Sequence, residues 1–440
     1  ALLLYAIDDA HGQTVGWIAN RNAIVSACLA LPAIAFHQRW ANGSRSAGAL
    51  AFLSLLAGLC AGETAICLVG YLVAYAFCLD RRPLRTRLLS LAPYIALLVA
   101  HRALYHALGL GSFGSSAYHD PLREPIAFAR MLGYNLPVLL SAELFVPVAD
   151  LAFWGDVSIR PLLFAWSVAS LALIVWLAWP LLRRDAHARF WAVGMSLAAV
   201  PISASLPGER LLLAVGFGGA ALMARLLRAL WEVRPTTFGP RRFVTDLLVL
   251  LHLVVAPLTL PLRAYALEPL ARATDRLDRQ FPRDRSIVDK TLIVLNAPID
   301  VLISYLQVSR AARSVPRPAH LYWLSSSSSP ARVTRVGPRT LQIEQARGFL
   351  LRPEETHYRD DARTLSDVAL SELHARVVAR LADGRPRAVA FEFREPLESP
   401  RYLFRIYRDG SLVAAAAAIS GGVTLPAEDF FRFVVLEAFR

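Results

Sequence analysis

Long apolar runs dominate the chain up to about residue 265 and shorten after it. Runs of about 20 residues with few charges match the length of helix that crosses a bilayer core of roughly 30 Å. They lie at residues 20–38, 47–79, 88–107, 161–182, 189–206, 211–229 and 244–263. The run 47–79 is too long for one crossing. We expect it to divide at Gly62 and Glu63, since a glycine and an acid cost least at an interface, and the pattern then predicts eight crossings.

Arginine-rich loops alternate with arginine-poor turns along this region. Positive residues gather on the cytoplasmic side of a membrane, and the basic loops share that side only if segment 127–150 does not cross completely. That segment contains Asn135, Pro137, Glu143 and Asp150, which favours a re-entrant or interfacial element lining a cavity. A ninth full crossing, with the second half of the bundle reversed, is the alternative.

The pattern changes again after Arg263, where charged residues become frequent and β-type alternation begins. "KTLIVLNAP" predicts a buried strand leading into a turn, residues 299–313 a helix, and later segments short strands separated by Gly, Pro and Asp-Gly turns. We therefore expect a mainly α protein with a transmembrane helical domain at 1–265, a linker at 266–285 and a β-rich sandwich or barrel at 286–440. The topology places this last domain outside the cytoplasm, which in a bacterium is the periplasmic side of the inner membrane.

Composition supports a membrane protein. Hydrophobic residues make up 55% of the chain and charged residues only 18%, too few to cover a soluble protein of this size. The net charge of +13 raises the possibility of a nucleic-acid partner, but the arginines lie in short clusters between apolar spans. That distribution is typical of helix anchoring, so we expect membrane lipids as partners and no nucleic acid.

The four cysteines all lie inside apolar stretches, away from histidines at metal-ligand spacing. Neither a disulfide framework nor a metal site is expected, and no cofactor is indicated. The chain starts at Ala1, and no basic-then-apolar signal segment precedes Asp8. We expect that the natural N-terminus lies further upstream.

The opening segment, "YAIDDAHGQTVGWIANRN", is the most informative for chemistry. It gathers Asp8, Asp9, His11, Gln13 and Arg21 beside the first span. Charges so close to hydrocarbon are costly unless they are paired or face water, which predicts a functional cavity. A carboxylate with a nearby histidine supplies a general base, and arginine is a natural partner of phosphate. The alternative is structural, with an aspartate capping a helix and Arg21 anchoring at the headgroups.

This segment resembles the signature of bacterial polytopic glycosyltransferases of the GT-C fold, related to protein O-mannosyltransferases, in which it commonly has the form "HPxHxExVxWIxxR". The match holds at His11, Val15, Trp17, Ile18 and Arg21. "LAGLCAGETAICL" is similar to the family's "KE" segment at Glu63, and "GERLLLAVGFG" to its "ERYxYLPxxG" segment at Glu209 and Arg210. Asp8-Asp9 replaces the expected His-Pro, Gln13 the expected glutamate and Gly62 the expected lysine, so an active enzyme and a diverged, inactive relative both stay open.

The resemblance implies transfer of a sugar from a polyprenyl-phosphate donor to an acceptor on the outer face, with inversion. Asp8 or Asp9 would then be the catalytic acid group. Substrate binding would fall to cationic and orienting side chains, namely His11, Arg21, Glu63, Arg102, Glu209 and Arg210.

Two other functions compete with this one. A transporter or lipid flippase also lines its path with polar residues, but it predicts an internal repeat with broken helices, which we do not find in the sequence. A non-catalytic envelope scaffold, binding partners through its β-rich domain, predicts that Asp8, Asp9 and Arg210 tolerate alanine.

Overall fold

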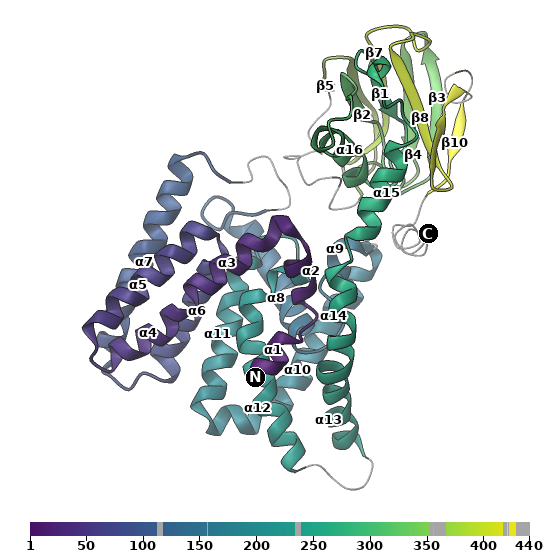
Figure 1. The fold of residues 1–440 in the computed structure, drawn as a ribbon. Helices are drawn as coiled ribbons and strands as arrows, with labels where there is room; N and C mark the ends of the chain where they lie inside the picture. The colour runs from purple at the N-terminus through teal and green to yellow at the C-terminus, as the bar shows by residue number, and fades with distance from the viewer. Residues whose placement is uncertain are drawn as a thin grey trace. The chain divides into compact units, whose positions relative to one another are not determined.

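A computed structural model describes residues 1–111, 118–155, 157–233, 239–351, 355, 367–416, 420 and 422–427. Helices make up 59% of the described residues and the C-terminal region forms β-sheets (Figure 1), which confirms the predicted mainly α class followed by a β-rich region. The described chain divides into two compact units, with the boundary between Leu267 and Glu268.

The first unit consists of helices joined by short connections. Its α-helices are α1 (Leu2–Ala6), α2 (His11–Gly16), α3 (Arg21–Ala30), α4 (Pro32–Ala41), α5 (Arg45–Ala61), α6 (Thr64–Cys78), α7 (Leu84–Ala107), α8 (Pro125–Leu144), α9 (Leu151–Trp154), α10 (Arg160–Arg184), α11 (Ala186–Ile202), α12 (Leu213–Glu232), α13 (Pro240–Leu250) and α14 (Ala256–Ala264). The 3-10 turns are η1 (Ile18–Asn20), η2 (Val157–Ile159) and η3 (Glu209–Leu211), and a π-helical turn, η4 (Leu251–Val255), joins α13 to α14.

Five helical segments of the described chain are long and apolar enough to cross a membrane, which indicates a membrane protein. They are Ile18–Ala41, Leu84–Ala107, Arg160–Arg184, Leu213–Glu232 and Pro240–Asp278. The shorter apolar helices α5 and α6 meet at the predicted break, where Gly62 has an extended backbone and Glu63 precedes α6. Much of segment 127–150 belongs to the continuous helix α8. The count of eight crossings and the re-entrant element stay predictions.

Glycines let the central helices of this unit approach closely. A Cβ atom on Gly194 of α11 would lie 2.3 Å from Cδ1 of Tyr71 on α6, and one on Gly70 of α6 would lie 2.8 Å from Cβ of Leu197. Tyr71 is fully buried, and its hydroxyl donates a hydrogen bond to the carbonyl of Ala214 at 2.8 Å. Close backbone approach through small residues is the usual way that helices pack in membranes.

Within its described residues the second unit contains two sheets, two α-helices and a 3-10 turn, η5 (Arg285–Ile287) (Figure 1). Its elements are α15 (Glu268–Asp278), β1 (Thr291–Val294), α16 (Asp300–Ala312), β2 (His320–Trp323), β3 (Ala331–Gly337), β4 (Thr340–Gln345), β5 (Asp367–Ala369), β6 (Leu373–Arg380), β7 (Pro386–Phe393), β8 (Tyr402–Arg408), β9 (Ser411–Ala414) and β10 (Val423–Leu425). The four-stranded sheet has the order β2-β1-β8-β9, and the six-stranded sheet has the order β10-β3-β4-β7-β6-β5.

One hydrophobic core joins the two sheets. It includes Ile293 of β1 and Phe404 of β8 from the smaller sheet and Ile343 of β4 and Phe391 of β7 from the larger one. Strand β1 is buried along its whole length and pairs in parallel with β2 and β8, as an apolar strand covered on both faces does. The predicted buried strand and the helix at 299–313 are both present, as β1 and α16.

The stretch 266–285 is not an unstructured linker. It contains helix α15, which packs against α16. The buried carboxylate of Asp278, at the end of α15, pairs with the buried guanidinium of Arg310 on α16. Arg310 also donates to the carbonyls of Pro282 at 3.0 Å and Pro316 at 2.8 Å. A buried pair with its remaining donors satisfied fixes this segment within the second unit.

Candidate functional site

Helix α2 lies directly against α14 because two glycines face that helix (Figure 1). A Cβ atom on Gly12 would lie 2.6 Å from Cβ of Arg263, and one on Gly16 would lie 2.0 Å from the carbonyl oxygen of Ala264. Larger residues at these positions would push the helices apart. The local sequence of the opening segment therefore brings its acids to the end of α14.

Arg263 joins two of the predicted acids. Its Nε lies 2.8 Å from Oδ2 of Asp9, and its Nη1 pairs with the carboxylate of Glu209, which is 3% exposed. Thr259, one helical turn earlier on α14, donates a hydrogen bond of 2.9 Å to the same oxygen of Asp9. Sequence reasoning missed Arg263, because an arginine at the end of an apolar span is also the ordinary headgroup anchor.

A third acid, Asp150, extends this cluster. Nε2 of Gln13 donates to its Oδ2 at 3.1 Å, and the backbone N–H of Glu209 donates to its Oδ1 at 3.3 Å. Burial raises the pKa of Asp150 above its ordinary value, while Arg263 and Arg210 oppose that shift. Sequence analysis placed Asp150 in the polar segment 127–150 but not in the site. The signal that could have identified Asp150 was its position among apolar residues.

Asp8 and His11 lie beside this ion-paired group. Oδ1 of Asp8 accepts the backbone N–H of Ala10 at 3.0 Å, so that the carboxylate caps the turn leading into α2. Burial raises the pKa of Asp8 to about 6, although that hydrogen bond and Arg263 act in the opposite direction. Burial lowers the pKa of His11 to about 4, and its ring lies 4.3 Å from that of Tyr5 between centroids. His11 is therefore neutral at pH 7, whereas Asp8 titrates just below it.

Glu143 of α8 is a further buried acid in this region, and sequence reasoning did not assign it to the site. It is 6% exposed, and its Oε2 has no hydrogen-bond partner in the described part of the chain. Two glycines of α12 make room for it: a Cβ atom on Gly219 would lie 2.1 Å from its Oε1, and one on Gly216 would lie 3.5 Å from the same atom. The space beside Gly216 also borders Nε2 of His11, at 3.2 Å from the same Cβ position.

Arg210 follows Glu209 in the sequence and contacts the opening segment. Its backbone carbonyl accepts the hydroxyl of Thr14 at 3.0 Å, and its guanidinium carbon lies 5.1 Å from the centroid of the Trp17 ring. Among the described residues no hydrogen bond of the Arg210 guanidinium is found besides this ring contact, and such N–H groups are suited to bind an anion.

The remaining predicted residues lie elsewhere in the unit. Arg102 pairs with Asp120, and its guanidinium carbon lies 5.8 Å from the ring centroid of Tyr105. Tyr105 in turn hydrogen bonds to Glu63. Arg21 is exposed at the start of α3. The structure thus joins Asp8, Asp9, His11, Glu209 and Arg210 in one region, and groups Glu63 with Arg102 in another.

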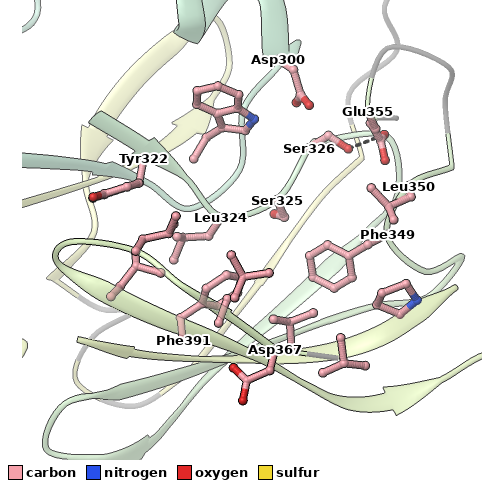
Figure 2. Close-up of a pocket in the computed structure, with 18 residues that line it drawn as sticks. Asp300, Tyr322, Leu324, Ser325, Ser326, Phe349, Leu350, Glu355, Asp367 and Phe391 are labelled. Carbon is pink, nitrogen blue, oxygen red and sulfur yellow. Dashed lines mark hydrogen bonds between the residues drawn. The ribbon is translucent and has the colours of Figure 1, made fainter. Parts of the chain in front are cut away.

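The second unit has a cavity of about 380 Å³ between its sheets (Figure 2). Apolar side chains such as Leu324, Phe349 and Phe391 form most of its wall. Glu355 lies at one end, where it accepts hydrogen bonds from the hydroxyl of Ser326 at 2.6 Å and the backbone N–H of Leu351 at 2.9 Å. Both carboxylate oxygens of Glu355 are therefore engaged. Two more acids, Asp300 and Asp367, also line the cavity, and Asp367 pairs with His374.

Neither a family model nor a curated protein or solved structure matches this chain. Among the described residues, no group of three or more His, Cys, Asp and Glu side chains is arranged to hold a metal ion. The resemblance to GT-C glycosyltransferases stays a prediction. The cluster around Arg263 is the structural feature on which a proposal of function can be based.

Proposed function

We propose that this membrane protein transfers a sugar from a polyprenyl-phosphate donor to an acceptor hydroxyl, at a site formed by the opening segment, η3 and the end of α14. The observation that carries the proposal is the ion-paired cluster in which Arg263 binds both Asp9 and Glu209. Such a cluster in an apolar bundle is costly to build and is typical of a functional site.

Asp8 is the best candidate for the general base. Asp9 and Glu209 are held by Arg263, and a carboxylate in an ion pair is a weak base. Asp8 has no such partner in the described part of the chain, and burial raises its pKa to about 6, close to the pH at which it would work. Asp9, Glu209 and Arg263 are then the frame that fixes the loop carrying Asp8.

The proposed reaction is a single displacement. Asp8 removes the proton of the acceptor hydroxyl while the acceptor oxygen forms a bond to the anomeric carbon. The bond from that carbon to the phosphate oxygen breaks, and polyprenyl phosphate leaves with the electron pair. Arg210, whose backbone carbonyl accepts the hydroxyl of Thr14 in α2, would stabilise the negative charge that develops on the leaving phosphate.

We further propose that the site and the second unit face the periplasm of a bacterial inner membrane. The arginine-rich loops that support this orientation include the one between α6 and α7, with Arg81 and Arg82. Labelling of single cysteines at position 81 and at position 289 with a membrane-impermeant reagent tests this orientation. The proposed orientation requires that position 289 reacts in spheroplasts and that position 81 reacts only after lysis.

The direct test of function is donor cleavage by the purified chain in proteoliposomes. The reaction is followed as release of free polyprenyl phosphate from a series of polyprenyl-phosphate sugars, with membrane glycan acceptors supplied. Release that requires an acceptor and is lost in Asp8→Asn supports the proposal. The matched control is Gly133→Ala, because a Cβ atom on Gly133 has no atom within 4 Å. Equal release by wild type and Asp8→Asn would overturn the assignment of Asp8.

A transporter remains the second candidate, because carboxylates outnumber cations in this region. Asp8, Asp9, Asp150 and Glu143 accompany Glu209 and the single ion-pairing arginine, Arg263. Clusters of this kind are found along proton and ion paths. The same proteoliposomes discriminate the two functions: a transporter moves the intact lipid-linked sugar between leaflets without releasing polyprenyl phosphate.

A further inference from the structure

The first unit contains a cavity of about 410 Å³ that is lined by α8, the start of α10, α9 and the loop before η3. Its charged lining groups are Arg130, Arg160 and His119. No acidic side chain lines it among the described residues. The cavity is therefore lined by cationic side chains. It lies in a part of the protein that has no role in the proposed reaction.

One face of α8 forms a wall of the cavity. Ala127, Arg130, Met131, Tyr134 and Asn135 all line it, at the spacing of three and four residues that places side chains on one side of a helix. Arg160 faces them from the first turn of α10. Arginines from two different helices thus contribute to the same space.

Hydrogen bonds and ring packing hold these walls in place. Nδ2 of Asn135 donates to the carbonyls of Ser203 at 3.0 Å and Ser205 at 2.8 Å, which ties α8 to the loop before η3. The Tyr134 ring stacks on that of Phe164, with 5.7 Å between centroids, which ties α8 to α10. The cavity is therefore bounded by fixed elements, as a preformed binding site is.

The arginines of the cavity lack anionic partners. In the described part of the chain no carboxylate pairs with Arg130 or Arg160, and Nε of Arg160 is buried without a hydrogen-bond partner. Glu124, which does not line the cavity, is bonded to Nδ1 of His119 at 2.9 Å. A buried donor without an acceptor is costly, and a bound anion would remove that cost.

We infer that this cavity binds a phosphate group, with Arg130 and Arg160 as its main ligands. Guanidinium groups present paired N–H donors that match phosphate oxygens, and His119 adds a third cationic group when it is protonated. The phosphate can belong to a lipid headgroup or to free phosphate in solution, and the chemistry of recognition is the same. This inference goes beyond the proposed sugar transfer, because binding is measured without any reaction.

The cavity also adjoins the candidate active site along the chain. Ala152, on its wall, follows Asp150 by two positions, and Pro207 precedes Glu209 by two positions. Asp150 and Glu209 are themselves hydrogen bonded, from the backbone N–H of Glu209 to Oδ1 of Asp150 at 3.3 Å. A lipid whose phosphate occupies the cavity would hold its headgroup close to the acids of the proposed site.

The test is equilibrium binding by the full chain in phosphatidylcholine nanodiscs. The probes are a fluorescent short-chain polyprenyl phosphate, the corresponding polyprenol, and inorganic phosphate as competitor. We expect the phosphate-bearing lipid to bind more tightly than the alcohol, and the variant Arg130→Gln/Arg160→Gln to weaken its binding by about tenfold or more. Arg160→Lys, which keeps the charge, is expected to retain part of the affinity.

The control variant is Arg85→Gln, an exposed arginine at the start of α7 that does not line the cavity. Competition by millimolar inorganic phosphate identifies free phosphate as a ligand, and absence of competition identifies the lipid headgroup. Either result supports the inference. The inference is overturned if wild type binds the polyprenyl phosphate and the polyprenol with equal affinity. It is also overturned if the correctly folded double variant binds the polyprenyl phosphate as tightly as wild type does.

Discussion

Nε of Arg263 lies 2.8 Å from Oδ2 of Asp9, although the first residue belongs to the last apolar helix of the first unit and the second to the opening segment. The same guanidinium pairs with Glu209. One cation therefore holds two acids from different parts of the chain, and it fixes the loop that carries Asp8. The account of function depends on this arrangement.

Replacing Arg263 by methionine is expected to destabilise the first unit by about 3–5 kcal/mol, since both acids would remain without their counter-charge. Their side chains are 22% and 4% exposed for Asp9 and Glu209, so solvent compensates little. Thermal unfolding in nanodiscs measures the loss. Adding Asp9→Asn and Glu209→Gln to Arg263→Met should restore part of it, and a triple variant as unstable as the single one would contradict the ion-pair explanation.

Gly219→Ala should destabilise the protein because the new Cβ would lie 2.1 Å from Oε1 and 2.6 Å from Cγ of Glu143. Overpacking of this kind typically costs about 1–3 kcal/mol. Glu143→Ala in the same chain removes the clash and should recover stability. The matched control is Gly133→Ala in α8, where nothing lies within 4 Å and a small gain in helix stability is expected. Equal melting temperatures for the two glycine variants would refute the close contact.

The hydrogen bond from Gln13 to Asp150 predicts a pH-dependent variant. In Gln13→Glu two carboxyl groups face each other, and their repulsion raises the pKa of the pair in the folded state. A raised folded-state pKa means that stability is present at low pH and is lost as the pH rises. The melting temperature of Gln13→Glu should therefore fall further below wild type at about pH 8 than at about pH 5, whereas Gln13→Met should show a similar deficit at both. A larger deficit at the lower pH would contradict this pairing.

Arg310→Met should destabilise the second unit by about 3–5 kcal/mol, because Asp278 would stay buried with a reduced set of partners. Unfolding of the β-rich unit in the full chain, followed by limited proteolysis, measures this effect. Arg376→Met, on strand β6, is the control, since no ion pair of Arg376 is among those found in the described residues. Unchanged protease resistance in Arg310→Met would show that 266–285 is held by other contacts.

Some of the fold follows from the sequence alone. The apolar runs predicted the helical first unit, Gly62 and Glu63 predicted the end of α5, and the run ending at Val294 predicted the buried strand β1. The helix α15 was missed because five of its eleven residues are charged, yet Ala273, Thr274, Leu277 and Asp278 are buried on one side of it. Patterns of hydropathy report burial, but they do not identify a polar residue whose partner is distant in the chain.

The site was predictable only in part for the same reason. Asp8, Asp9 and His11 stand out because they interrupt an apolar segment, and Glu209 and Arg210 because they interrupt another. Glu143, Asp150 and Arg263 complete the region, yet each has an ordinary local explanation in sequence. Their roles depend on contacts between α2, α8, η3 and α14, which no spacing within one segment encodes.

The most direct test of the account is the pH dependence of donor cleavage by wild type and by Asp8→Asn in proteoliposomes. A general base acts only when it is deprotonated, and burial raises the pKa of Asp8 to about 6. We predict that the wild-type rate rises as the pH passes through that value and then levels off, and that Asp8→Asn loses about 100-fold or more of the rate at neutral pH. A wild-type rate that does not change across this range, together with an Asp8→Asn variant of equal rate, would contradict the central claim.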